Sequence, residues 1–207
     1  MKADGMSEEE INKRHADKMA KKKAARDKMI AKKTLEKGLL MVHTGKGKGK
    51  TTAAMGLATR AVGNGMKVCI IQFVKGVWNT GEREILKNYP DLCIMKAMGE
   101  GFTWDTQDRV RDVAAAEKAW SYALEAMQDE SIKMLVLDEL NIVLRYDYLD
   151  FNAVLAALKN KRPDLHIVIT GRNAKDELIE AADMVTEMTQ IKHHFRGGVK
   201  AQIGIEF

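Results

Sequence analysis

The run Thr44–Thr52 (TGKGKGKTT) constrains the fold more than any other feature of the sequence. An apolar run, Leu39–Val42, precedes it, and a helix-forming run, Lys50–Val62, follows it. Its glycines let the backbone curl so that successive N–H groups point at one centre, and the helix N-terminus adds partial positive charge. A strand, a glycine-rich turn and a helix in this order predict a P-loop, which binds nucleotide phosphates. The alternative, a Gly/Lys-rich surface turn, does not account for this agreement.

The spacing of the loop departs from the usual G-x-x-x-x-G-K-[ST] pattern. Only three residues separate Gly45 from Gly49, and Thr44 stands where the pattern has its first glycine. The loop is therefore either one residue short or anchored differently. In either case we expect Lys50 to bridge the outer phosphates and the Thr51 hydroxyl to bind Mg²⁺ or Mn²⁺.

A second segment, Met134–Glu139 (MLVLDE), supports this interpretation. It is an apolar run that ends in two carboxylates, about 90 residues after the loop. Many buried strands end in aspartate, but after a P-loop this pattern indicates an acid beside Mg²⁺. Ligands of open α/β sheets lie at the carboxyl ends of the strands, where Thr51, Asp138 and Glu139 all fall. Thr51, Asp138 and Glu139 are the predicted metal-binding residues, and which of the two carboxylates binds the metal directly stays open.

From residue 38 onwards, short apolar runs alternate with helical patterns, which is typical of an α/β fold. We expect a P-loop, RecA-like domain over 38–207, with a mostly parallel sheet flanked by helices, and a basic helical arm over 1–37. The expected strands are Gly38–Thr44, Lys67–Val74, Leu92–Ala97, Met134–Asp138, His166–Thr170, Met184–Thr189 and a possible edge strand, Ala201–Glu206. The expected helices are Lys50–Val62, Gly81–Asn88, Asp105–Asp129, Phe151–Asn160 and Ala174–Ala182. In Asp105–Asp129 the apolar face is predicted to be Val110, Val113, Trp120, Leu124 and Met127.

The arm is predicted to be one polar helix over residues 7–36. Ser7 and Glu10 match the capping-box pattern, and the residues after them are good helix formers. Its apolar face is thin, so the helix is marginal without a partner surface. The arm is either a solvated segment or a lid over a site.

Charge and hydropathy exclude several classes of protein. Residues 1–37 hold 12 Lys/Arg and 7 Asp/Glu, whereas residues 38–207 hold 22 of each, so the net charge of +5 belongs to the arm. This argues against a globular nucleic-acid-binding face. No run approaches the roughly 18 apolar residues of a membrane span, and no apolar signal core begins the sequence, so we expect a cytoplasmic protein. Cys69 and Cys93 lie in apolar runs and are expected to be buried, reduced thiols.

Nine segments, in order between Gly38 and Phe207, resemble the P-loop ATP:corrinoid adenosyltransferases. They are Thr44–Ala53 (TGKGKGKTTA), Arg60–Gly63 (RAVG), Gln72–Gly76 (QFVKG), Gly81–Arg83 (GER), Gly101–Gln107 (GFTWDTQ), Leu137–Leu140 (LDEL), Asp147–Leu149 (DYL), Ile169–Arg172 (ITGR) and Gly198–Ile203 (GVKAQI). The strings GFTWDTQ and GVKAQ are specific to this family, whereas a P-loop is not. The departure in the loop also matches it.

The resemblance implies a reaction, its cosubstrates and its partners. In this family a Co(I) corrinoid attacks C5′ of the ATP ribose, and tripolyphosphate leaves. The triphosphate is described as lying in reverse along the P-loop. The resemblance further implies a homodimer, an electron donor such as a flavoprotein, and a leading helix that covers the active site, although residues 1–37 resemble the family in composition only.

The resemblance also implies roles for single residues. Phe102 and Trp104, which in isolation are more typical of a core, would lie at the corrinoid and help to displace its lower axial ligand. Lys46 and Arg60 would contact the nucleoside end of ATP or nearby groups. The complete predicted nucleotide set is Gly45, Lys46, Gly47, Lys48, Gly49, Lys50, Thr51, Thr52 and Arg60, and Lys50, Phe102 and Trp104 are the predicted catalytic residues.

Other residues remain open. His193 and His194 fit a loop or site wall better than a metal site. Trp78 lines the corrinoid cavity or packs in the core, and Arg172 binds an anion or is solvated. Two other functions also stay possible: a phosphoryl transferase or motor-type NTPase, and a nucleic-acid-binding ATPase that uses the arm. The first would release orthophosphate or ADP, and the second would bind nucleic acid with steep salt dependence.

Overall fold

The computed structural model describes residues 6–74, 80–97 and 108–206. Contacts between Cα atoms divide the chain into two units, Met1–Glu36 and Lys37–Phe207. The second unit holds a six-stranded sheet with the order β3-β2-β4-β5-β1-β6, and every described strand pair is parallel. The strands are β1 (Leu40–Thr44), β2 (Lys67–Gln72), β3 (Cys93–Ala97), β4 (Ile132–Asp138), β5 (His166–Thr170) and β6 (Met184–Glu187). The predicted α/β fold with a parallel sheet is therefore confirmed.

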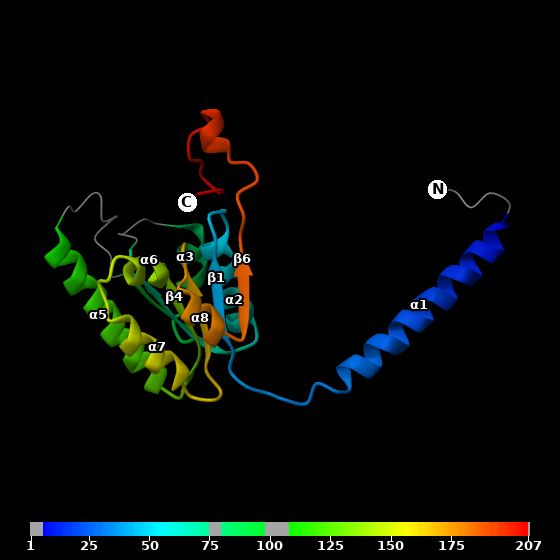
Figure 1. Cartoon of the computed structure of the whole chain (residues 1–207), viewed down its shortest axis with the longest axis horizontal. Coiled ribbons are helices and arrows are strands. Elements are labelled where there is room, and N and C mark those ends of the chain that lie inside the picture. Colours follow the sequence, from blue (N-terminus) through cyan, green and yellow to red (C-terminus); the bar gives the residue numbers. More distant parts are fainter. Residues whose placement is uncertain (1–5, 75–79, 98–107, 207) are drawn as a thin grey trace. The chain divides into compact units, whose positions relative to one another are not determined.

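Helices cover both faces of this sheet (Figure 1). The helices of the second unit are α2 (Lys50–Gly63), α3 (Gly81–Leu86), α5 (Arg109–Gln128), α6 (Leu140–Arg145), α7 (Phe151–Lys159), α8 (Asp176–Ala181) and the 3₁₀ turn η1 (His194–Gly197). Successive side chains of a strand point to opposite faces, so the core has two halves. Residues of α2 and α3 pack with Met41, Ile70 and Val136 on one face. Residues of α5 to α8 pack with Val42, Ile71 and Leu137 on the other.

The arm contains one helix, α1 (Glu8–Ile30). The predicted capping box is confirmed, because the Ser7 hydroxyl accepts from the Glu10 N–H and the Glu10 carboxylate accepts from the Ser7 N–H. The helix ends six residues before the predicted end at residue 36. No residue of α1 is buried, so no packing extends its C-terminal end.

The buried face of α5 differs from the prediction. Val110 is 81% exposed and Leu124 is 40% exposed, so neither belongs to a buried face. Met127 is buried as predicted and Trp120 packs partly buried against the core, but the rest of the buried face is a stripe of small residues, Ala116, Ala119, Ala123 and Ala126. Alanines let the helix axis approach the sheet closely, and larger residues such as Leu124 then lie toward its sides.

Two further segments correct the sequence-based expectations. Residues 201–206 form turns instead of an edge strand, because Gly204 has φ +82° and the N–H of Glu206 donates to the carbonyl of Gln202. The short helix α6 was not predicted. The left-handed backbone of Glu139 (φ 64°) ends the apolar run of β4 abruptly, and Leu140 starts the helix.

The described segments contain two buried, free cysteines, as predicted. Burial raises the pKa of the Cys69 thiol to about 11, so it stays protonated in the core. In the same segments, no helix is long and apolar enough to cross a membrane.

Candidate active site

The glycine-rich loop starts at the carboxyl end of β1 and ends at the first residue of α2. Gly45 (φ +94°) and Gly49 (φ +110°) adopt backbone conformations that L side chains rarely reach. The loop also runs against residues 188–189, where a Cβ at Gly45 or Gly47 would come within 2.5 or 2.7 Å of the Met188 carbonyl oxygen. Gly45 is therefore required both by backbone conformation and by close approach, Gly47 by close approach, and Gly49 by backbone conformation.

Thr44, which stands where the usual pattern has its first glycine, anchors the start of the loop. It is the last residue of β1, and its buried hydroxyl accepts a hydrogen bond from the Ala174 N–H at 3.1 Å. Its carbonyl accepts from the Met188 N–H at 2.9 Å. The residue in the usual glycine position thus ties the loop to the segments that follow β5 and β6. The loop is thus anchored at Thr44 through both of these segments.

Lys50 lies at the start of α2 beneath the loop. Its side chain is buried, and the ammonium donates to the carbonyl oxygens of Gly45 at 2.8 Å and Gly47 at 2.6 Å. Burial lowers the pKa of Lys50; the Glu139 carboxylate opposes this effect, and Arg172 adds to it. The N-cap of α2 is Gly49, with no side-chain cap, so the partial positive charge of the helix N-terminus and this cation both adjoin the loop.

Asp138 is completely buried at the carboxyl end of β4. One carboxylate oxygen accepts from the hydroxyls of Thr51 at 2.8 Å and Thr170 at 2.7 Å, and the other accepts from the Gln72 amide at 3.0 Å. These bonds connect the start of α2 with three neighbouring strand ends. The predicted meeting of Thr51 with the acidic pair at one sheet edge is thus observed.

Glu139 differs from Asp138 in exposure and in backbone. It is half-buried, and its N–H donates to the Thr170 hydroxyl at 2.8 Å. A Cβ at Gly171 would approach the Glu139 carboxylate to 3.2 Å, so Gly171 (φ +125°) leaves room beside it. Hydroxyl and carboxylate oxygens are hard ligands that suit Mg²⁺, which typically takes one or two carboxylates plus substrate phosphates. The described residues contain no group of three or more His, Cys, Asp or Glu side chains that could hold a metal ion.

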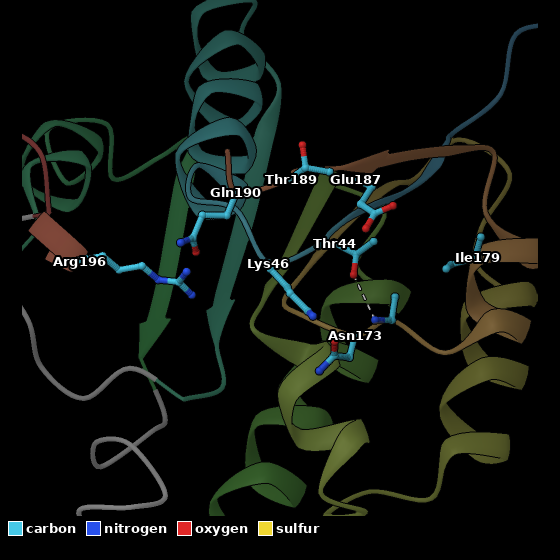
Figure 2. Close-up of a pocket in the computed structure, with 10 residues that line it drawn as sticks. Thr44, Lys46, Asn173, Ile179, Glu187, Thr189, Gln190 and Arg196 are labelled. Atoms are coloured by element: carbon cyan, nitrogen blue, oxygen red, sulfur yellow. Dashed lines mark hydrogen bonds between the residues drawn. The ribbon is translucent and has the colours of Figure 1, made fainter. Parts of the chain in front are cut away.

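A pocket of about 530 Å³ opens beside the start of the loop. Figure 2 shows that its lining comes from the ends of β1 and β6, from the segment after β5, and from η1. The polar or charged residues that line it are Thr44, Lys46, Asn173, Glu187, Thr189, Gln190 and Arg196. Of these, sequence analysis assigned only Lys46 to the site and quoted Thr44 in the loop. Asn173, Glu187, Thr189 and Gln190 lie at or just after strand ends, and the general position of ligands in parallel sheets could have indicated them, whereas Arg196 lies in η1.

The remaining predicted site residues are dispersed. Lys46 and Lys48 are exposed on the loop, and Thr52 is exposed on α2. Arg60 lies in the last turn of α2, on the order of 15 Å along the helix from Lys50, so this chain does not bring it to the loop. Phe102, Trp104 and Trp78 lie outside the described residues.

The two histidines also have defined surroundings. Their rings stack with centroids 4.8 Å apart, and His193 Nδ1 accepts from the Phe195 N–H at 3.2 Å. His194 lies 3.3 Å from the Glu206 carboxylate. In the part of the chain that the structure describes, these side chains are not arranged as a group of three that could hold a metal ion. Arg172 is exposed, and its positive charge helps to lower the pKa of Lys50.

Comparison with known proteins decides the family. The model for "ATP:corrinoid adenosyltransferase BtuR/CobO/CobP" matches residues 36–207. The chain belongs to this family. The model for "Cob(I)alamin adenosyltransferase N terminal" matches residues 6–30, so the arm resembles a family segment in sequence and not in composition alone.

Named relatives agree with this assignment to the corrinoid adenosyltransferases. The chain is 58% identical to a corrinoid adenosyltransferase of Sinorhizobium sp, over 94% of this chain and 92% of the relative. It is 48% identical to that of Pseudomonas aeruginosa (96% and 98%) and 41% identical to the corrinoid adenosyltransferase CobA of Salmonella typhimurium (94% and 98%). The predicted family and enzyme class, an adenosyltransferase acting on corrinoids, are confirmed.

Proposed function

We propose that this enzyme binds ATP at the loop 45–52, transfers its 5′-deoxyadenosyl group to the Co(I) centre of a corrinoid and releases tripolyphosphate. The cobalt electron pair forms the Co–C5′ bond, and the C5′–O bond breaks with its electrons on the departing phosphate oxygen. The observation that carries the proposal is the buried Lys50 ammonium under a glycine loop, next to the Thr51–Asp138 pair.

The proposed work of the protein is to bind and neutralise the leaving group. The departing tripolyphosphate keeps all its negative charge, so preorganised positive groups accelerate the reaction. Lys50, Lys48 and the first N–H groups of α2 supply that charge. Mg²⁺ or Mn²⁺ would be held by the Thr51 hydroxyl and Glu139, with Asp138 orienting Thr51, and would add positive charge when bound. Because Co(I) is the nucleophile, no side chain has to act as a general base.

The pocket beside Lys46 is the proposed place for the nucleoside end of ATP. Amides from Asn173 and Gln190 can both donate and accept hydrogen bonds, as a purine edge and a ribose require. Its position at the beginning of the loop suits a nucleotide whose triphosphate extends from there toward Lys50. Arg60 does not line this pocket, because it lies in the last turn of α2, away from the loop.

The finer properties implied by the resemblance remain part of the proposal. These are a homodimer, a cytoplasmic location, an electron donor such as a flavoprotein, no nucleic-acid partner, and an arm that acts as a lid. The family match over residues 6–30 supports a role for the arm in this enzyme class. A basic helix suits a lid above a polyanionic substrate.

The decisive experiment supplies ATP, Mg²⁺ and chemically reduced cobalamin, and follows the absorption spectrum of the Co–C product. The phosphate product is identified in the same reaction. We expect tripolyphosphate in equal amount to adenosylated corrinoid. Orthophosphate release that does not depend on the corrinoid would contradict the proposal and favour an NTPase.

Replacement of Trp104 by alanine tests its predicted place at the corrinoid. We expect Trp104→Ala to bind ATP normally but to adenosylate slowly when Co(II) corrinoid and a reductant are supplied. An apolar aromatic excludes water from cobalt and offers it no donor atom, which favours loss of the lower axial ligand. Unchanged activity from Co(II) starting material would refute the assigned role, and chemically reduced Co(I) corrinoid serves as the control substrate.

A further inference from the structure

The loop lysine Lys48 has a partner from the far end of the chain. Its ammonium forms an ion pair with the carboxylate of Glu206, which lies 158 residues later in the sequence. The Glu206 side chain is only 21% exposed, although the Lys48 side chain is 42% exposed. A carboxylate therefore lies where the proposed function needs Lys48 to meet a phosphate.

Local structure presents this carboxylate to the loop. The N–H groups of Ile205 and Glu206 both donate to the Gln202 carbonyl, and Gly204 is left-handed, so residues 202–206 form a compact turn. His194 of η1 lies 3.3 Å from the other carboxylate oxygen. The bond from Lys48, and then its charge and those of the histidines, lower the pKa of Glu206 and keep it ionised. The turn thus carries a fixed negative charge beside the loop.

Other phosphate-binding groups of the loop also have internal acceptors. The Gly47 N–H donates to the Met188 carbonyl at 2.6 Å, and Lys50 donates to the Gly45 and Gly47 carbonyls. These acceptors are neutral, whereas Glu206 is a full anion. Of these acceptors, Glu206 is the one that would both repel a triphosphate and occupy the Lys48 ammonium that would otherwise bind it.

We propose that Glu206 competes with the triphosphate for Lys48 and so sets how tightly ATP and tripolyphosphate bind. The turn 202–206 leaves Lys48 as a polyphosphate enters the loop and returns as it departs. The reaction releases an intact polyanion, which binds its cationic loop strongly, so an internal competitor promotes product release. This inference rests on the proposed function only in placing a triphosphate at the loop.

The test measures dissociation constants of inorganic tripolyphosphate and of ATP for the full chain without corrinoid. Glu206→Gln keeps the size of the side chain and removes its charge, and we expect about threefold to tenfold tighter binding of both ligands. Lys48→Gln should weaken binding. In the Lys48→Gln background, Glu206→Gln should tighten binding much less, because the competed cation is gone and only the repulsion between carboxylate and phosphates remains. Glu117→Gln on the exposed face of α5 is the matched control and should change neither constant.

A second readout follows the turn itself. Trypsin cleavage after Lys200 should accelerate when tripolyphosphate is added to the unaltered protein, and should be fast with or without it in Glu206→Gln. Unchanged affinity in Glu206→Gln, or tightening of the same size in the Lys48→Gln background, would overturn the proposal. A protein that passes these tests but forms no Co–C product would contradict the proposed reaction and leave the competition intact.

Discussion

Lys50→Ala is expected to reduce adenosyl transfer by about a hundredfold or more. The Lys50 ammonium is buried and lies within 2.8 Å of two loop carbonyls, so no water-exposed cation can take its place beside the phosphates. In such a site a positive charge interacts more strongly with the leaving group than it would in bulk water. The rate of Co–C bond formation and the dissociation constant of ATP are the measurements, and both should worsen.

The control for Lys50 is Lys159→Ala, which removes an exposed lysine in the last turn of α7. It should leave both measurements unchanged. Circular dichroism of both variants separates a lost cation from a lost fold. If Lys50→Ala retained more than a tenth of the normal rate while folded, the leaving-group role of Lys50 would be wrong.

Asp138→Ala is expected to damage both stability and activity. Three donors, from Thr51, Thr170 and Gln72, lose their buried acceptor together. Leaving buried polar groups without partners costs roughly 2–5 kcal/mol, which lowers the melting temperature by on the order of 10 °C in a domain of this size. Thr51 also loses the bond that orients its hydroxyl, so ATP binding in the presence of Mg²⁺ should weaken. Thermal denaturation and ATP titration measure the two effects.

Glu139→Gln is the matched variant, because Glu139 is adjacent to Asp138 but half-buried. Its melting temperature should stay close to that of the unaltered protein, whereas turnover should fall at least about tenfold and require more Mg²⁺. A large loss of stability in Glu139→Gln, or normal turnover in Asp138→Ala, would reverse the roles assigned to the two carboxylates.

Local sequence patterns were sufficient to predict much of this protein's structure. The capping box of Ser7 and Glu10 depends on residues three positions apart. The conformation of loop residues 45–49 depends on glycines that can adopt positive φ. The strands of the sheet coincide with short apolar runs. The meeting of Thr51 and Asp138 at one sheet edge was also predictable, because parallel strands present their carboxyl ends on one side. The family followed from strings that extend across the whole domain.

Local patterns failed where a residue's environment comes from distant chain segments. The Ala stripe of α5 is buried because the sheet lies close to it, and the helical periodicity alone favoured larger residues. Residues 201–206 alternate like a strand, yet no sheet edge is paired with them and Gly204 turns the chain. Arg60 shares a family string with the loop helix, but the length of α2 separates it from the loop.

By itself, then, the sequence determined a P-loop domain, its acidic partner strand, a capped basic arm and the corrinoid adenosyltransferase family. Only the tertiary structure decided that Thr44 anchors the loop through Ala174, that Asp138 orients Thr51, and that Glu206 pairs with Lys48. Each of these contacts joins residues more than 80 positions apart. Such pairs depend on the strand order of the sheet, and no hydrogen bond or periodicity within one segment encodes that order.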